Sequence, residues 1–116
     1  MHNFKKLDIW IKSMDLVIDI YLLTNSFPNY ERFGLSSQMQ RAAVSIPTNI
    51  SEGSAKSSNK DFARFLEMSI GSSFELETEL IVATNLKYLD SVVSISTQNK
   101  INEIQKMILG FKNKLD

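Results

Sequence analysis

The sequence predicts an all-α protein with the architecture of an antiparallel up-down-up-down four-helix bundle. In four separate segments, apolar residues recur at steps of three and four positions, which is the period of an amphipathic helix. No alternation of apolar and polar residues, the pattern of a half-buried strand, extends over a comparable length. Short connections between the segments favour antiparallel neighbours, and 116 residues fit a single domain spanning 1–116.

The first helix is expected near residues 7–26, where the apolar stripe begins at Leu7. It should stop near Phe27-Pro28, because proline disfavours helical backbone in the residue before it. The stripe is wider than a single core-facing seam, since it is flanked by Ile11, Ile18 and Leu22. Excess apolar width on a small domain often marks an oligomer surface.

The second helix is expected over residues 35–55, with Ser37 and Gln40 as a capping box at its start. Pro47 lies inside this segment. In a continuous helix it would leave the Ala43 carbonyl without its amide partner and bend the axis. A real break at Pro47 is the alternative.

The third helix is expected over residues 59–88, after a polar loop. Ser58 followed by Asp61 resembles a capping box, with aspartate in place of the usual glutamate. Small residues at Gly71, Ser72 and Ser73 lower helix propensity in the middle of the segment, but they also permit close approach of another backbone.

The fourth helix is expected over residues 97–114, where isoleucines recur at the spacing of a bundle seam. Gly110 lies inside this helix and should weaken it by about 1 kcal/mol relative to alanine. The preceding run Val92-Val93-Ser94-Ile95 is β-prone but too short to build a sheet.

Composition excludes several classes of function. Thirteen basic and thirteen acidic residues cancel, so the strongly basic coat typical of nucleic-acid-binding proteins is absent. The chain has no cysteine, and its one histidine, His2, is expected at a frayed terminus. Glu75 and Glu79 share a helix face, but a di-iron bundle requires additional histidines. We therefore expect a solvated acidic face, no cofactor, no metal and, without a nucleophile–base pair, no enzymatic activity.

The sequence also lacks the signals of export or membrane insertion. Charges interrupt the apolar positions of the N-terminal segment, and no stretch approaches the roughly 18 apolar residues that span a bilayer. A soluble, cytoplasmic protein is the expectation.

One face of the second helix carries an unusual polar stripe, whose members are separated by three or four positions: Gln38, Arg41, Ser45, Asn49 and Glu52. These side chains make directional hydrogen bonds, whereas a solvated face usually carries lysine and glutamate. We expect a structural network, buried or spanning subunits, for which Arg64 and Glu67 are natural partners. A ligand site is the alternative.

Basic residues are unevenly distributed. Lys5 and Lys6 lie near the N-terminus, and the last helix carries Lys100, Lys106, Lys112 and Lys114. Such a patch could contact phosphates, which dominate nucleic-acid affinity. The alternative is a solvated helix face whose C-terminal lysines are favoured by the helix dipole.

The central segment of the chain carries a longer motif. Residues 34–80 read GLSSQMQRAAVSIPTNISEGSAKSSNKDFARFLEMSIGSSFELETEL. This stretch resembles the signature of the bacterial four-helix bundle family named for the 23S rRNA intervening sequence. The matching positions are Gly34, Leu35, Gln38, Arg41, Ala42, Ser45, Ile46, Asn49, Ile50, Glu52, Gly53, Phe62, Phe65, Leu66, Gly71, Ser72, Glu75 and Leu80. Gln40 and the loop Ser54-Ala55-Lys56 depart from the pattern, which often has arginine there.

The resemblance implies a ring-like homopentamer and a link to RNA. The family is often labelled ribosomal-protein-like, and its relatives among the accessory proteins of diversity-generating retroelements bind nucleic acid. We therefore expect a non-enzymatic oligomeric scaffold that engages RNA or a ribonucleoprotein; the alternative is a protein-binding adaptor without nucleic-acid contact. The candidate RNA contacts are Lys5, Lys6, Arg41, Lys56, Lys100, Lys106, Lys112 and Lys114.

Overall fold

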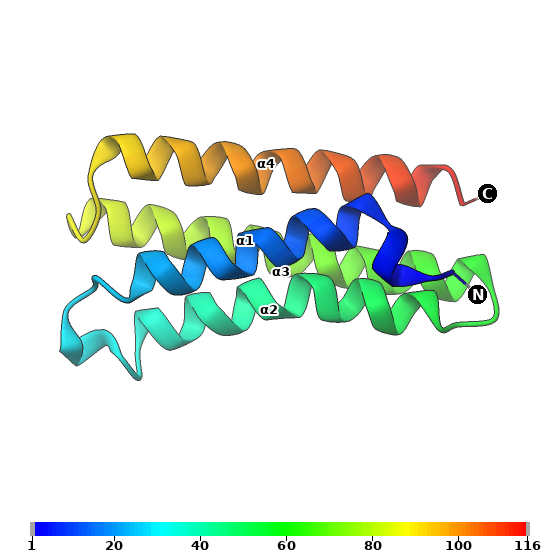
Figure 1. The fold of residues 1–116 in the computed structure, drawn as a ribbon, viewed down its shortest axis with the longest axis horizontal. Helices are drawn as coiled ribbons and strands as arrows, with labels where there is room; N and C mark the ends of the chain where they lie inside the picture. The colour runs from blue at the N-terminus through cyan, green and yellow to red at the C-terminus, as the bar shows by residue number, and fades with distance from the viewer. Residues whose placement is uncertain (1, 116) are drawn as a thin grey trace.

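The computed structural model describes residues 2–115 as four antiparallel helices arranged in a bundle (Figure 1). The helices are α1 (Asp8–Thr24), α2 (Leu35–Ser54), α3 (Asn59–Asn85) and α4 (Ser91–Asn113). Short 3₁₀ turns at Phe4–Lys6 and Asn29–Glu31 precede α1 and α2. The described chain contains no strand, so the predicted fold class is confirmed.

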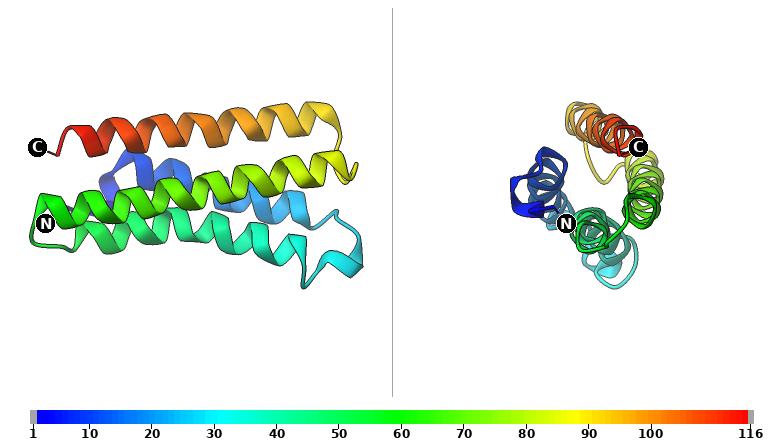
Figure 2. Two further views of the ribbon diagram at one scale, coloured as in Figure 1. Left: turned by 180° about the vertical axis from the view of Figure 1, so that it is seen from behind. Right: turned by 90° about the vertical axis from the view of Figure 1, so that its right-hand side faces the viewer.

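The helices follow one another around the bundle, so that α1 and α3 lie diagonally opposite (Figure 2). The bundle measures 44 × 24 × 20 Å. Both chain ends and the loop 55–58 lie at one end of its long axis, which we call the terminal end. The loops 25–34 and 86–90 lie at the other end, which we call the turn end.

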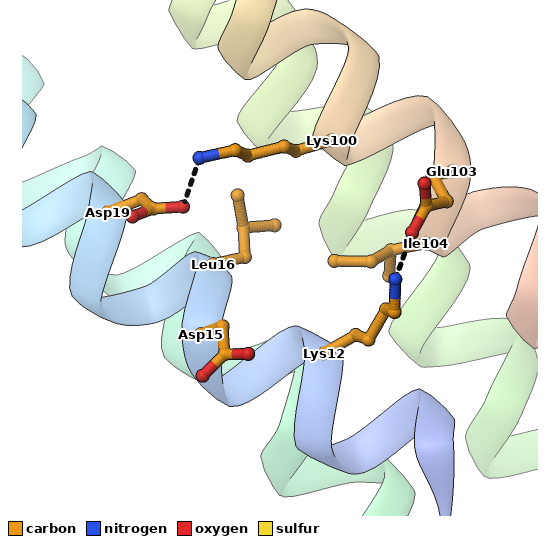
Figure 3. Close-up of a pocket in the computed structure, with 7 residues that line it drawn as sticks. All are labelled: Lys12, Asp15, Leu16, Asp19, Lys100, Glu103 and Ile104. Atoms are coloured by element: carbon orange, nitrogen blue, oxygen red, sulfur yellow. Dashed lines mark hydrogen bonds and ion pairs between the residues drawn. The ribbon is translucent and has the colours of Figure 1, made fainter.

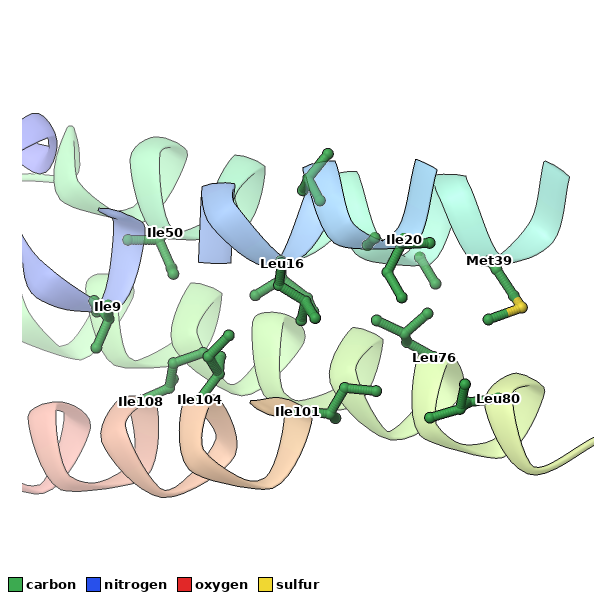
Figure 4. Close-up of a cluster of buried hydrophobic side chains, with 14 of the residues drawn as sticks. Ile9, Leu16, Ile20, Met39, Ile50, Leu76, Leu80, Ile101, Ile104 and Ile108 are labelled. Carbon is green, nitrogen blue, oxygen red and sulfur yellow. The ribbon is translucent and has the colours of Figure 1, made fainter. Parts of the chain in front are cut away.

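The core runs along the bundle axis and takes side chains from all four helices (Figure 4). Leu16 and Ile20 of α1 meet Leu76 of α3 and Ile101 of α4 there, each 1% exposed or less. Every position of this kind belongs to the three-and-four periodicity of its helix, which is why the pattern predicts burial. At the terminal end, Gly53 lets α2 approach Phe62 and Phe65 of α3.

Helix α2 runs without a break through Pro47, so the alternative of a real break is wrong. Proline removes one amide donor, yet the carbonyls just before it accept hydrogen bonds from side chains. Thr48 Oγ1 donates to the Val44 carbonyl at 2.8 Å, and Asn49 Nδ2 donates to that of Ser45 at 2.9 Å. From α3, Ser69 Oγ donates to the Ile46 carbonyl at 2.9 Å. The helix therefore continues through Pro47 with side-chain hydrogen bonds to three carbonyls of the preceding turn, while the bond that the proline itself removes is the one to the Ala43 carbonyl.

The expected capping box of Ser37 and Gln40 is wrong. Helix α2 begins at Leu35, whose amide donates to Glu31 Oε1 at 3.1 Å. Gln40 Nε2 instead donates to Thr24 Oγ1 of α1 at 3.0 Å. The 3₁₀ turn before α2 brings the Glu31 carboxylate over the helix start, and it therefore replaces a cap from within the helix.

At the starts of α3 and α4, a side-chain cap determines the residue at which the helix begins. Ser58 Oγ accepts from the Asp61 amide at 3.1 Å, which confirms the predicted cap of α3. Helix α4 begins at Ser91, upstream of the expected start at residue 97, because Asp90 caps it by accepting from the Val93 amide at 2.9 Å. The β-prone run 92–95 is consequently helical: an aspartate cap outweighs the weak strand preference of isolated β-branched residues.

Candidate nucleic-acid interface

The terminal end of the bundle carries basic residues from three separate parts of the chain. Lys5 and Lys6 lie on the first 3₁₀ turn, Lys56 on the loop between α2 and α3, and Lys114 just after α4. All four residues are exposed. The antiparallel topology is the cause, because it returns both termini and the α2–α3 loop to the same end.

The chain near the N-terminus is tied down at this end, contrary to the expected fraying of His2. The His2 ring packs edge-on against Phe62 at 5.1 Å and Phe111 at 5.9 Å between ring centroids. Its amide donates to the Ser54 carbonyl at 3.3 Å. On the opposite terminus, Asn59 Nδ2 donates to the carbonyl of Leu115. These contacts hold the two terminal segments against the bundle, so Lys5, Lys6 and Lys114 lie on backbone with a defined position.

Several of these lysines keep their charge available to a ligand. Lys56 Nζ lies 4.9 Å from the centroid of the Phe65 ring, and Lys5 Nζ lies 6.0 Å from that of Phe4. Within residues 2–115, Lys6 and Lys114 form no ion pair. Lys112 is different, since it pairs with Glu67 at 3.2 Å.

A hollow of about 860 Å³ opens beside this group, between the start of α3 and the end of α4. Its walls include Lys60, Arg64 and Lys112, together with Asp61 and Glu67. Neither Lys60 nor Arg64 is among the predicted RNA contacts. Arg64 was expected, with Glu67, to be a partner of the polar stripe on α2, but Glu67 pairs with Lys112 in the structure. The sequence signal that could have identified Lys60 and Arg64 is the Ser58 cap, because a helix that starts at residue 59 places both residues beside the α2–α3 loop.

The remaining predicted contacts lie elsewhere. Lys100 donates to Asp19 Oδ2 at 2.8 Å across a pocket of about 360 Å³ between α1 and α4 (Figure 3). At the same pocket Lys12 donates to Glu103 Oε1 at 2.7 Å, and this hydrogen bond raises the pKa of Lys12. Lys106 is exposed on α4, and Arg41 is exposed on α2 toward the turn end. The structure therefore does not bring these residues to the terminal lysines.

The polar stripe of α2 divides into bonded and unbonded members. Ser45 Oγ lies 2.8 Å from Ser72 Oγ of α3, and Asn49 Nδ2 donates to Ser45 Oγ at 3.0 Å. The side chains of Gln38, Arg41 and Glu52 are exposed and form no hydrogen bond or ion pair within residues 2–115. Inside one chain the network is thus limited to the Ser45 and Asn49 region. A network of Arg41 and Glu52 across subunits stays a prediction.

The acidic pair on α3 is not uniformly solvated. Glu75 is exposed, whereas Glu79 Oε1 is buried and has no hydrogen-bond partner in the described chain. Burial, with a further contribution from the charge of Glu75, raises the pKa of Glu79 to about 7. Among residues 2–115, no three potential ligands from His, Cys, Asp and Glu come together as a metal site.

Helix α1 presents an apolar outer surface, which we call the α1 face. Its members are Ile11, Met14, Ile18, Tyr21 and Leu22, and Leu22 is 70% exposed. On the diagonal helix α3, Phe74 and Ile81 are also about half exposed, at 56% and 47%. In the described part of the chain, no helix is long and apolar enough to cross a membrane.

Comparisons with known proteins give one consistent result. The model of a family described as 23S rRNA-intervening sequence protein matches residues 5–110. A solved structure of a protein of unknown function from the S23 ribosomal protein family of Bacteroides thetaiotaomicron VPI-5482 is similar, with a TM-score of 0.84. The two chains are 24% identical, and the match covers 91% of this chain and 99% of the other. No protein with a curated description matches this chain at a significant level.

Proposed function

This chain belongs to the 23S rRNA-intervening sequence protein family, and from that premise we propose that it is a non-enzymatic, cytoplasmic scaffold that engages RNA or a ribonucleoprotein. The observation that carries the proposal is the clustering of Lys5, Lys6, Lys56 and Lys114 at the terminal end. Phosphate neutralisation by such side chains supplies most of the affinity of non-specific nucleic-acid binding.

The net charge of zero does not oppose this proposal, because charge is distributed unevenly over the bundle. Acidic side chains compensate Lys12 and Lys100 along the middle of the α1–α4 seam. At the terminal end, Lys6 and Lys114 are exposed and unpaired within the described chain. A local excess of positive charge is what attracts a polyanion, within a screening length of about 8–10 Å.

A salt-dependent titration tests the proposal. Labelled structured RNA is titrated with protein at about 50 mM and about 200 mM salt, and affinity should fall steeply between them. The triple variant Lys6→Gln, Lys56→Gln, Lys114→Gln should lower the slope of log affinity against log salt by about 2. Lys87→Gln is the matched control, because Lys87 is exposed at the opposite end. Absence of binding at the lower salt would refute RNA engagement.

The scaffold is further proposed to be a ring-shaped homopentamer, built on the α1 face. An apolar face of this kind on a small domain is typical of a subunit contact. Because the exposed Phe74 and Ile81 lie on the diagonal helix, the two apolar surfaces point in different directions. Joining one to the other gives a heterologous contact, which closes into a ring when the rotation between neighbours is right.

Light scattering combined with size-exclusion chromatography measures this assembly directly. The double variant Ile18→Asp, Leu22→Asp should reduce the particle mass while leaving the helical circular dichroism spectrum unchanged, because both residues are exposed in one chain. Val92→Asp is the control, since Val92 is 76% exposed on α4. An unchanged mass in the double variant would show that the α1 face is not the contact.

The second candidate function is a protein-binding adaptor, favoured by the same apolar surfaces. Purification from a nuclease-treated lysate separates the two candidates. A protein partner that remains bound after nuclease treatment, together with no RNA affinity in the titration, would support the adaptor.

A further inference from the structure

Two outer faces of the bundle are apolar. One is the α1 face defined above. The other, which we call the α3 face, consists of side chains that are 42–56% exposed: Met68, Phe74, Ile81 and Val82. Because α1 and α3 lie diagonally opposite in the bundle, the two faces point in different directions (Figure 2). One chain cannot cover its α1 face with its own α3 face, whereas a second copy of the chain can.

The helices that carry these faces run in the same direction, since α1 and α3 both begin at the terminal end. Side-chain contacts with α2 give their relative heights along the bundle. Gln40 of α2 bonds to Thr24 of α1, and Ser45, five positions further along α2, contacts Ser72 of α3. Because α3 runs opposite to α2, the same five positions bring Thr24 level with residue 77 of α3. Each residue of α1 is therefore level with the α3 residue about 53 positions later.

The charges near the terminal end of the two helices are complementary. Lys12 of α1 and Glu67 of α3 are already paired with residues of α4. Four exposed charges form no ion pair within residues 2–115, and these are Asp8 and Asp15 on α1 and Lys60 and Arg64 on α3. The charge left free is thus acidic on α1 and basic on α3. Complementary charge of this kind selects the partner and fixes the register of an interface.

A parallel contact at equal height brings these opposite charges together. Asp8 is level with residue 61, next to Lys60, and Asp15 is level with residue 68, one helical turn from Arg64. Residues one turn apart are neighbours on a helix surface, so both acids have a basic partner within reach. An antiparallel contact would instead place Asp8 beside Ile81, at the apolar turn end of α3.

The same register brings apolar side chains together toward the turn end. Leu22 is level with residue 75, next to Phe74, and these two side chains are 70% and 56% exposed in one chain. A contact between level residues of parallel helices involves no displacement along the helices. Repeated copies then form a ring rather than an open helical filament.

We propose that neighbouring copies of this chain pack the α1 face against the α3 face in parallel and at equal height, so that their terminal ends form one basic surface for a single RNA strand. The inference rests on the RNA engagement and the ring proposed above, and it adds the orientation of the subunits. The lysines of neighbouring copies then lie about one bundle width apart, and the bundle is 24 × 20 Å across. At about 3.4 Å per nucleotide, roughly seven nucleotides span that width.

Chemical cross-linking tests the orientation, and the absence of cysteine from the sequence makes it site-specific. The double variant Asp8→Cys, Lys60→Cys is treated with a short bismaleimide and separated on a denaturing gel. It should give a ladder of covalent oligomers. Asp8→Cys, Asn85→Cys is the matched control, because Asn85 is exposed at the other end of α3, about 37 Å from Lys60 at 1.5 Å per residue. The control pair should give no ladder.

The length dependence of RNA affinity tests the shared surface. Oligouridylates of about 6 and about 24 nucleotides are titrated at low salt, and the wild type should bind the longer strand more than about 100-fold more tightly. In Ile18→Asp, Leu22→Asp the gain should fall to about 20-fold, the statistical factor for a strand that offers about twenty short sites to one subunit. Val92→Asp is the control and should keep the full gain, because Val92 lies on α4.

The outcomes separate this inference from the proposed function. If the wild type is larger than one chain but the Lys60 pair gives no ladder, or the Asn85 pair gives one, the parallel contact is wrong and the assembly stands. If the wild type gains only about 20-fold with length, the shared surface is wrong and RNA engagement by single subunits stands. If neither strand binds, RNA engagement is refuted and the shared surface with it. A wild type that is a single chain overturns both the ring and this inference.

Discussion

Replacing Gly53 by alanine probes the close approach that sets the geometry of the terminal end. Gly53 lies near the end of α2, three residues before Lys56, and its Cα faces α3. An added Cβ would lie 2.7 Å from Phe65 Cβ and 2.8 Å from Phe62 Cδ1. Ordinary carbon–carbon contacts are about 3.5–4.0 Å, so both approaches are strongly repulsive.

Two opposing terms decide the magnitude. In an open helix position, glycine to alanine stabilises by about 0.5–1 kcal/mol, because it removes backbone freedom from the unfolded chain. Overpacking a well-filled contact costs about 1–3 kcal/mol. The cost should be toward the upper part of that range, because the Phe65 Cβ moves only with its backbone and Phe62 is 2% exposed. The net expectation is a loss of about 1–2 kcal/mol, or roughly 5 °C in Tm.

Thermal unfolding followed by circular dichroism measures this loss, and the chain contains two internal controls. A Cβ at Gly71 or Gly110 meets nothing within 4 Å, so Gly71→Ala and Gly110→Ala should each stabilise by about 0.5–1 kcal/mol. If Gly53→Ala melts at or above the temperature of these two variants, the close packing of α2 on α3 is not as described and the steric argument fails.

Three further predictions follow from individual side chains. Arg41→Ala tests the predicted network across subunits, because Arg41 is exposed and unpaired in the described chain: the network predicts a loss of more than about 2 kcal/mol in a denaturant titration, and a change of no more than about 0.5 kcal/mol would refute it. Glu79→Gln should raise Tm at about pH 8 and leave it nearly unchanged at about pH 4. The pKa of Glu79 is raised from its ordinary value of 4.5 to about 7, so between these pH values the unfolded carboxyl has released a proton that the folded one retains, and stability is lost as pH rises, by about 1 kcal/mol after solvent screening. Equal Tm gains at both pH values would contradict this. Glu31→Ala should cost about 1–2 kcal/mol in thermal unfolding and more than Tyr88→Phe, because Glu31 both caps α2 and accepts from the Tyr88 hydroxyl at 2.8 Å; equal losses would mean that the cap contributes nothing.

Much of the helical architecture could be predicted from the sequence because its signals are local. The stripe predicted for α3 includes Phe62, Leu66 and Leu76, and all three are fully or almost fully buried. The Ser58 cap was correct for the same reason, since a cap involves residues three positions apart. The predicted start of α4 was six residues too late, because the strand preference of Val92 and Val93 was taken to outweigh the helix cap that Asp90 provides.

The candidate sites depend on contacts between residues distant in sequence, and here prediction was partial. Lys100 and Lys114 look alike in the sequence, yet Lys100 is compensated by Asp19 from another helix and Lys114 is not, within the described residues. The start of α2 at residue 35 was predicted correctly, but its capping box was wrong, because the cap comes from Glu31 of the preceding turn rather than from the helix itself. Arg41 was expected in a buried network, but it is exposed in a single chain. Whether its side chain is buried depends on the subunit that covers the outer face of α2, which the sequence does not specify.

The sequence by itself determined the number of helices, their apolar faces and the family to which the chain belongs, because periodicity and motif are properties of neighbouring residues. Only the tertiary structure decided that Lys5, Lys56 and Lys114 share one end of the bundle, and that Lys12 and Lys100 are each paired with an acidic residue of another helix. The physical reason is that folding into antiparallel helices joins segments about fifty residues apart, and a charge or hydroxyl acquires its role from the groups that then surround it.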